Sequence, residues 1–245
     1  MTPKLLPISS ADSFQFECSS AVACFNECCR DLNQYLTPYD ILRLKTALGM
    51  ESDDFLQTYT RSHLGPESGL PIVTLKPGNQ RTLTCPFVSP SGCRVYRDRP
   101  SSCRTYPIVR TIRRDRATGN LNEDYLLLKE AHCMGFDQQK TQSVREWVIN
   151  QEILPYNQFN DMLMELIALK NQRHPQPLDK QSSDIFKLAL YDLDRFRTHL
   201  FKEKRAGDFD ADKALLESAQ SDDSALLQVG IQYVKTMIFF SNSDT

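Results

Sequence analysis

Apolar residues recur every three or four positions through the second half of the chain, a pattern typical of helices that bury one face. In one such segment Phe159, Leu163 and Leu166 share the same side of the expected helix. The spacing predicts helices at about 141–154, 156–172, 183–204, 210–219 and 223–240. We therefore expect a helical bundle, with a linker at the His-Pro-Gln-Pro stretch of residues 174–177.

The first half of the chain has a less regular pattern and more Gly-Pro and Pro-Gly turn signals, so we expect loops and short elements there. Thr37, Pro38 and Asp40 match a helix N-cap, a first-turn proline and an acidic third position. They predict a helix that runs through Leu48. A second helix is predicted at about 52–63, where apolar residues again fall on one face.

Two segments farther along have the pattern of paired strands. Residues 106–112 and 121–129 flank a glycine-containing stretch at 116–120, which predicts a β-hairpin. The elements together predict a mainly α protein with a small β-hairpin, in which a loop-rich N-terminal part precedes a helical C-terminal part. Acidic pairs at 53–54 and 222–223 fall at predicted helix starts, where they interact favourably with the helix dipole.

The composition is that of an ordinary globular protein. The chain has 245 residues, of which 40% are hydrophobic and 24% are charged, and its formal net charge is -2. This balance does not indicate a nucleic-acid partner. The apolar run at 5–8 is too short for a secretory signal, and polar residues interrupt the apolar stretch at 225–240, as in a buried helix. We therefore expect a cytoplasmic protein with no membrane partner.

Cysteine is distributed unevenly along the chain. All eight cysteines precede residue 134, and they are Cys18, Cys24, Cys28, Cys29, Cys85, Cys93, Cys103 and Cys133. A reducing compartment disfavours a framework of four disulfides, so metal binding or redox chemistry is the default interpretation. The distribution predicts two domains, a cysteine-cluster metal-binding domain at 1–138 and a helical bundle domain at 139–245.

The first four cysteines give the strongest signal, because close spacing lets one loop present several sulfurs to one metal at little cost in chain entropy. Adjacent Cys28 and Cys29 can share a centre only on a turn or a helix start, since neighbours in a strand point to opposite faces. The second group, from Cys85 to Cys133, is spaced more widely. Eight thiols fit two four-thiolate sites, or one site plus structural or redox thiols, and the spacing leaves both arrangements open.

Other interpretations of these residues stay open as well. Some of the cysteines could be buried free thiols, which pack well in cores. His132 is a further candidate ligand, although a solvated or hydrogen-bonded histidine is the commoner case. Between residues 94 and 116, eight arginines and two acids give a local charge of +6. Guanidinium groups there would neutralise a thiolate centre, which is the favoured interpretation. The alternative is an anionic ligand, either a phosphate-bearing cofactor or nucleic acid.

Several short motifs occur in an order that matches a known family. They are Phe16-Glu-Cys18, Cys24, Cys28-Cys29-Arg30, Cys85-Pro86-Phe87, Gly92-Cys93-Arg-Val-Tyr96, Arg99-Pro100, Cys103-Arg104 and Tyr106-Pro107. Over about 14–135 they resemble the YkgJ-type cysteine-cluster proteins, a family described as zinc- or iron-chelating or as containing an iron-sulfur cluster. The first block departs from the family pattern, because five residues separate Cys18 from Cys24.

The resemblance implies that the matching cysteines chelate the metal, with Cys133 as a later member of the set. By the same resemblance and by their charge, Arg99 and Arg104 are hypothesised to bind the cofactor by donating to the sulfurs. Tyr106 either packs or donates its hydroxyl, and packing is the favoured interpretation.

Three functions are compatible with these residues. The first is an iron-sulfur protein, of the 4Fe-4S type, in electron transfer or as an accessory to a modification reaction, with a redox or protein partner that the sequence does not identify. The second is a binding module with structural zinc. The third is a metal-dependent enzyme such as a lysine methylase-like protein, although no methyltransferase motif is present after residue 141. Eight thiols with only four histidines favour iron.

Overall fold

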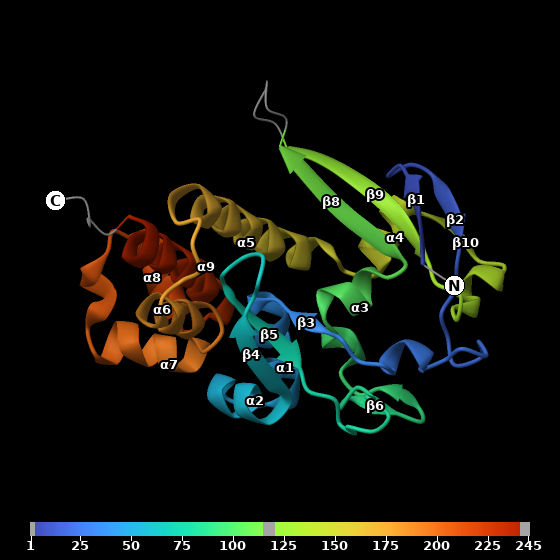
Figure 1. Ribbon diagram of the computed structural model, residues 1–245, viewed down its shortest axis with the longest axis horizontal. Helices are drawn as coiled ribbons and strands as arrows, with labels where there is room; N and C mark the ends of the chain where they lie inside the picture. Colours follow the sequence, from blue (N-terminus) through green and yellow to red (C-terminus); the bar gives the residue numbers. More distant parts are fainter. Residues whose placement is uncertain (1–2, 115–120, 241–245) are drawn as a thin grey trace. The chain divides into compact units, whose positions relative to one another are not determined.

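The computed structural model describes residues 3–114 and 121–240, and of these residues 48% lie in helices and 19% in strands of small sheets (Figure 1). The fold is therefore mixed and mainly helical, in agreement with the predicted class. Contacts within the chain divide it into two compact units. Unit 1 consists of Met1–Leu32 and Gly78–Pro155, and unit 2 consists of Asn33–Pro77 and Tyr156–Thr245.

A three-stranded antiparallel sheet forms part of unit 1. Its strands, in spatial order, are β1 (Lys4–Ile8), β9 (Leu121–Lys129) and β8 (Ile108–Arg114). The predicted hairpin is confirmed, because Ile108 pairs with Leu127 and the register continues along both strands. The sequence pattern did not reveal the third strand, β1, which pairs with β9. The loop predicted at 116–120 lies outside the described residues.

Aromatic side chains dominate the core of unit 1. Three short elements surround it: β2 (Ser13–Gln15), its partner β10 (Thr141–Ser143), and α4 (Val144–Asn150). Trp147 of α4 packs edge-on against Phe16, with the ring centroids 5.5 Å apart and the planes at 89°. These contacts join residues 139–155 to unit 1, whereas the cysteine distribution predicted a boundary at 138. The composition of the chain changes after its last cysteine, but unit 1 continues to Pro155.

The rest of unit 1 consists of very short elements. They are 3-10 turns at Glu27–Cys29, Tyr96–Asp98 and Met134–Asp137, the strands β6 (Val88–Ser89) and β7 (Gly92–Cys93), and helix α3 (Ser101–Thr105). Because these elements are too short to be stable alone, hydrogen bonds between distant segments hold them in place.

The first part of unit 2 contains two helices and a small sheet. They are α1 (Pro38–Leu48), α2 (Ser52–Tyr59), and the strands β3 (Tyr35–Leu36), β5 (Pro71–Leu75) and β4 (Thr60–Leu64), in that spatial order. The predicted start of α1 is confirmed, because Thr37 and Asp40 form a reciprocal capping box. The predicted helix at 52–63 is too long: it ends at Tyr59, because residues 60–64 pair with β5. This long-range pairing overrides the local helical pattern.

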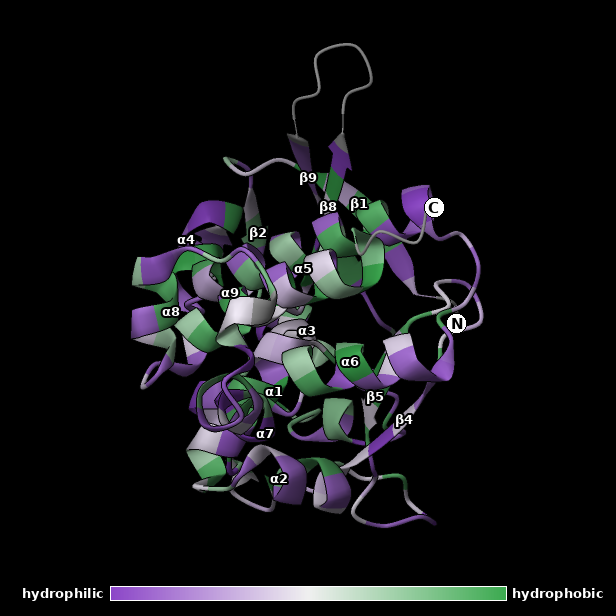
Figure 2. Ribbon diagram, turned by 90° about the vertical axis from the view of Figure 1, so that its left-hand side faces the viewer, coloured by the Kyte–Doolittle hydropathy of each residue, from purple (hydrophilic) through white to green (hydrophobic). Residues whose placement is uncertain are grey.

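The C-terminal helices agree broadly with the predicted segments. They are α5 (Leu154–Arg173), α6 (Lys180–Leu190), α7 (Leu193–Arg197), α8 (Lys213–Ala219) and α9 (Asp223–Val234), with π-helical turns at Thr198–Lys202 and Lys235–Phe239. Hydrophobic and hydrophilic residues alternate along them, as expected for amphipathic helices (Figure 2). The segment predicted at 183–204 is broken between α6 and α7. Among the described residues, no helix has both the length and the apolar character needed to cross a bilayer.

Residues 33–77 pack with these C-terminal helices and not with the cysteine-bearing segments of unit 1. Helix α1 contacts α9, α2 contacts α7, and β5 contacts α6. Helices α6 and α9 approach so closely that a Cβ atom at Gly230 would lie 2.1 Å from the carbonyl oxygen of Ala189. The predicted domain at 1–138 therefore differs from the observed packing in this segment too, because the apolar faces of α1 and α2 are buried by partners late in the chain.

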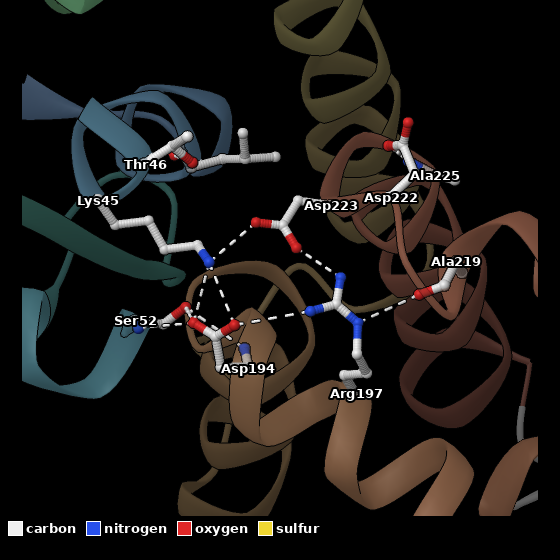
Figure 3. Close-up of polar contacts among 10 residues, drawn as sticks. Lys45, Thr46, Ser52, Asp194, Arg197, Ala219, Asp222, Asp223 and Ala225 are labelled. Atoms are coloured by element: carbon white, nitrogen blue, oxygen red, sulfur yellow. Dashed lines mark hydrogen bonds and ion pairs between the residues drawn. The ribbon is translucent and has the colours of Figure 1, made fainter. Parts of the chain in front are cut away.

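A group of charged residues, which we call the Lys45 cluster, connects three helices of unit 2 (Figure 3). It consists of Lys45, Asp194, Arg197 and Asp223. The Lys45 ammonium lies 2.9 Å from an Asp194 carboxylate oxygen and 2.8 Å from one of Asp223. The acidic pair at 222–223 thus does more than favour a helix dipole: Asp222 caps α9 by accepting from the Ala225 N–H, and Asp223 binds two cations.

Candidate metal centre

Every cysteine of the chain lies in unit 1, and all eight are free thiols. Cys18, Cys28 and Cys103 are exposed, whereas the remaining five are half-buried. Residues 33–77, which separate the two cysteine groups in the sequence, belong to unit 2. The fold therefore places in one compact unit thiols that are more than a hundred residues apart in the chain.

Backbone hydrogen bonds fasten the segment at 16–18 to the segment at 133–140. The Glu17 N–H donates to the Gly135 carbonyl at 3.0 Å, and the Phe16 N–H donates to the Lys140 carbonyl at 2.9 Å. The Met134 N–H donates to the Cys24 sulfur at 3.2 Å. Cys18 and Cys24 are therefore held beside Cys133.

Gly135 makes this close approach possible. A Cβ atom at this position would lie 2.5 Å from a ring carbon of Phe16 and 2.9 Å from the Glu17 carbonyl oxygen. Phe16 is 1% exposed and belongs to the core of unit 1, against which Cys133 also packs. The aromatic core thus supports this part of the cysteine cluster directly.

A second set of hydrogen bonds fastens the segment at 26–32 to the segment at 83–93. The Cys85 N–H donates to the Cys29 carbonyl at 2.8 Å, and the Leu32 N–H donates to the Leu83 carbonyl at 2.9 Å. The Asn26 side chain donates to the Ser89 carbonyl at 2.9 Å. Cys93 pairs with Val88 in the β6–β7 hairpin, so it lies in the same segment as Cys85.

Cys28 and Cys29 lie on a 3-10 turn that follows Asn26, whose φ is 69°. A turn is the geometry that the sequence required if the two thiols are to share a centre. Their sulfurs are 4.0 Å apart and form a hydrogen bond. This hydrogen bond lowers the pKa of Cys28 to about 7 and raises the pKa of Cys29. Burial and the thiols of Cys85 and Cys103 raise the pKa of Cys29 further.

Burial and the negative charge of neighbouring thiolates raise the pKa of four further thiols. Burial raises the pKa of Cys18 to about 11, and the thiols of Cys28, Cys24 and Cys133 add to the rise. Burial also raises the pKa of Cys85, Cys93 and Cys133. Thiolates crowded in this way repel one another, so a bound cation would stabilise their charged form. The donor set therefore fits a thiophilic metal such as zinc or iron.

Arg99 and Arg104 are buried next to the cysteines, 8% and 3% exposed. Arg99 donates to the Tyr96 carbonyl and to the side-chain oxygen of Gln151. Arg104 donates to the Gln151 carbonyl at 2.6 Å and to the Arg97 carbonyl. The charge of Arg99 also acts on the thiols, because it partly offsets the effect of burial on the pKa of Cys93. These contacts give both guanidinium groups a role in fixing the chain around the thiols.

Gln151 is a residue that the sequence interpretation missed. It ends helix α4, and both its side chain and its carbonyl accept hydrogen bonds from the two buried arginines. A glutamine at a helix end resembles any solvated residue, and this one lies beyond the predicted boundary at 138. No local signal in the sequence distinguishes it.

Acids from another strand partly balance the positive charge of the arginine-rich stretch at 94–116. Arg110 lies 2.6 Å from Glu123, and Arg113 lies 2.6 Å from Asp124, so strand β9 supplies acids that the count over 94–116 left out. His132 pairs with Glu130 at 3.8 Å and is about half exposed. Tyr106 packs edge-on against Phe16, and its hydroxyl also acts on Cys133, where it partly offsets the rise in pKa that burial causes.

The fold brings all eight cysteines into unit 1, but their side chains do not surround a common point. Within residues 3–114 and 121–240, no three His, Cys, Asp or Glu side chains lie close enough together to hold one metal ion. Metal binding therefore requires the thiol side chains to close around the ion, while the backbone contacts described above bring their segments together.

One protein family matches the chain, and it is the CxxCxxCC family, described as a "Putative zinc- or iron-chelating domain". The match covers residues 17–142, which is half of the chain and includes all eight cysteines. It agrees with the resemblance to the YkgJ-type cysteine-cluster proteins. No curated protein and no solved structure matches the chain.

Proposed function

Because the chain belongs to the CxxCxxCC family of zinc- or iron-chelating domains, we propose that its clustered cysteines hold an iron-sulfur cluster and that the protein acts in electron transfer or as an accessory to a modification reaction. Metal chelation follows from the family, and the choice of iron-sulfur is the added step. The observation that supports it best is the gathering of eight free thiols, from two groups far apart in the sequence, into unit 1.

The cysteines are the proposed ligands, drawn from Cys18, Cys24, Cys28, Cys29, Cys85, Cys93, Cys103 and Cys133. When bound, such a cluster supplies a one-electron redox couple. The chain's own residues provide the surroundings. Arg99 contributes positive charge near the thiols, and Gln151 fixes its guanidinium group. Phe16 and Tyr106 exclude water from the side on which Cys133 packs.

Sulfur donors with few histidines suit iron-sulfur clusters, but they also suit zinc. One observation favours structural zinc as the second candidate. The segments that carry Cys28, Cys29 and Cys93 are a 3-10 turn and a two-residue strand, elements that gain stability from a metal cross-link. In that case the protein is a binding module without catalytic activity.

Metal analysis of the full chain, purified without oxygen, distinguishes the two candidates. We expect iron and acid-labile sulfide, together with charge-transfer absorption near ~400 nm. Zinc without iron or sulfide would support the structural module instead. A chain that takes up neither metal when iron, sulfide and zinc are supplied in turn would contradict both.

A further inference from the structure

We propose that the cysteines form two separately supported metal sites, and that Cys18, Cys24 and Cys133 make up a site of their own, which takes a thiophilic divalent cation such as Zn²⁺. We call these three residues the first cysteine set. The second cysteine set consists of Cys28, Cys29, Cys85, Cys93 and Cys103. The inference rests on the proposed function, because it assumes that the clustered thiols bind metal at all.

The first argument comes from the backbone hydrogen bonds. Residues 16–18 are fastened to 133–140, and the Cys24 sulfur accepts from the Met134 N–H in that same segment. Residues 26–32 are fastened instead to 83–93. Up to Cys24 the N-terminal cysteine segment is therefore bonded to 133–140, and from Asn26 it is bonded to 83–93. Cys24 and Cys28 lie on opposite sides of this change.

The local conformation supports the division at this point. Glu27 donates its N–H to the Cys24 carbonyl, and Asn26 has a left-handed conformation with φ of 69°, so the chain turns between the two sets. The Phe25 ring lies against Gly92, where a Cβ atom would be 3.0 Å from the ring. An aromatic side chain just after Cys24 is thus anchored on the hairpin that carries Cys93.

The two sets also rest on different parts of unit 1. Cys133 packs against the aromatic core that contains Phe16 and Trp147. Cys85 and Cys93 lie in and beside the β6–β7 hairpin, outside that core cluster. Cys28 is placed in the second set because its sulfur is 4.0 Å from that of Cys29, although its charge also acts on Cys18.

Three thiolates leave one coordination position of a tetrahedral zinc ion for water or another ligand, whereas the second set has more than four thiols. The sets therefore differ in chemistry as well as in support. A cation held by the first set is expected to exchange more readily than one held by the second, because fewer sulfur bonds must be broken.

The test is a metal titration of the full chain, freed of metal under reducing conditions. With Zn²⁺ in competition with a chromophoric chelator, we expect the unmodified chain to bind about two equivalents. Cys133→Ala and Cys24→Ala are each expected to remove about one equivalent. Because the second set has five thiols, the triple variant Cys29→Ala/Cys85→Ala/Cys93→Ala, which leaves two of them, is expected to remove the other. Met134→Leu is the matched control: its side chain is 47% exposed and its N–H is kept, so both equivalents should remain.

Loss of all metal from Cys133→Ala and from the triple variant alike would show one shared site and overturn the inference. Because an alanine variant could fail to fold, the unmodified chain is also titrated with Co²⁺, whose thiolate absorption reports each site. Two successive spectra are expected, and one spectrum complete at a single equivalent would contradict the proposal. If the chain binds no Zn²⁺ or Co²⁺ and acquires no iron, the result would instead contradict the proposed function itself.

Discussion

In unit 2, two acids and two bases contact and balance one another, whereas unit 1 carries eight thiols and two buried arginines that donate mainly to backbone carbonyls. The Lys45 cluster contains its own counter-ions, with contacts from 2.5 to 3.6 Å. The thiols of unit 1 lack this balance, and burial raises the pKa of several of them. The comparison teaches that the Lys45 cluster supplies its own counter-charges, whereas on the proposed function the thiols of unit 1 obtain theirs from a metal cation.

Metal removal is the largest expected perturbation, and it should separate the two units. Thiolate-bound structural metal contributes on the order of 10 kcal/mol to folding, so a strong chelator should expose the backbone of unit 1. Hydrogen exchange followed by mass spectrometry measures this region by region. We expect loss of protection at 16–32 and 83–103 and unchanged protection in α1, α6 and α9. Equal loss in both units would contradict the contrast.

Lys45→Met should be the strongest single change in unit 2. Lys45 is 6% exposed and is the cation between Asp194 and Asp223. Removing it leaves two half-buried carboxylates facing each other with Arg197 alone, at a cost of about 3 kcal/mol in the free energy of unfolding. Chemical denaturation measures the change. Lys202→Met, at an exposed position, is the control and should stay within about 0.5 kcal/mol of the unmodified chain.

Gly135→Ala tests whether the thiols of unit 1 depend on the aromatic core. The added methyl group would meet the Phe16 ring and the Glu17 carbonyl, so we expect a loss of about 1–3 kcal/mol and weaker metal binding by Cys18, Cys24 and Cys133. Denaturation and zinc titration measure the two effects. Gly207→Ala is the matched control, because a Cβ atom there has no neighbour within 4 Å. Equal results for the two variants would exclude a role for this close contact.

Acid should produce the smallest effect, measured on the metal-free chain at the carboxylates of the Lys45 cluster. Burial alone would raise the pKa of Asp194 and Asp223, but hydrogen bonds from Ser52 and Lys45 to Asp194, and from Lys45 and Arg197 to Asp223, outweigh it and lower both pKa values. Their stabilisation is therefore present above the unfolded pKa of about 4 and is lost as the pH falls through the lower folded values.

Denaturation between about pH 5 and pH 2 checks this sign, with Asp223→Asn as the comparison. The unmodified chain should lose more stability than the variant over this range, because the variant has one carboxylate fewer to protonate. Parallel curves for the two proteins would contradict the assignment.

Local patterns allowed a good part of the fold to be predicted. The capping of α1 by Thr37 and Asp40 involves residues three positions apart, and the β8–β9 hairpin joins neighbouring segments. Such features depend on interactions that lie close in the sequence. The cysteines were also found, because thiol spacing carries chemical information without a fold.

What could not be predicted depends on contacts between distant segments. Residues 60–64 continue a helical pattern but pair with β5. Residues 33–77 pack in the same unit as the helices at the C-terminal end. Gln151 gains its importance only because Arg99 and Arg104 reach it from about fifty positions away. The Lys45 cluster is similar, since its lysine and its two acids are on three helices far apart in the chain.

The path of the chain out of unit 1 at Leu32 and back at Gly78 sets an order of events during protein synthesis. At ribosomal rates of about 5–20 residues per second, roughly 5–20 s pass between the emergence of Cys29 and that of Cys133. The early thiols are therefore reactive on the nascent chain before their partners exist. On the proposed ligand set, the early thiols must stay reduced over that interval, and metal loading is completed only after the last cysteine has left the ribosome.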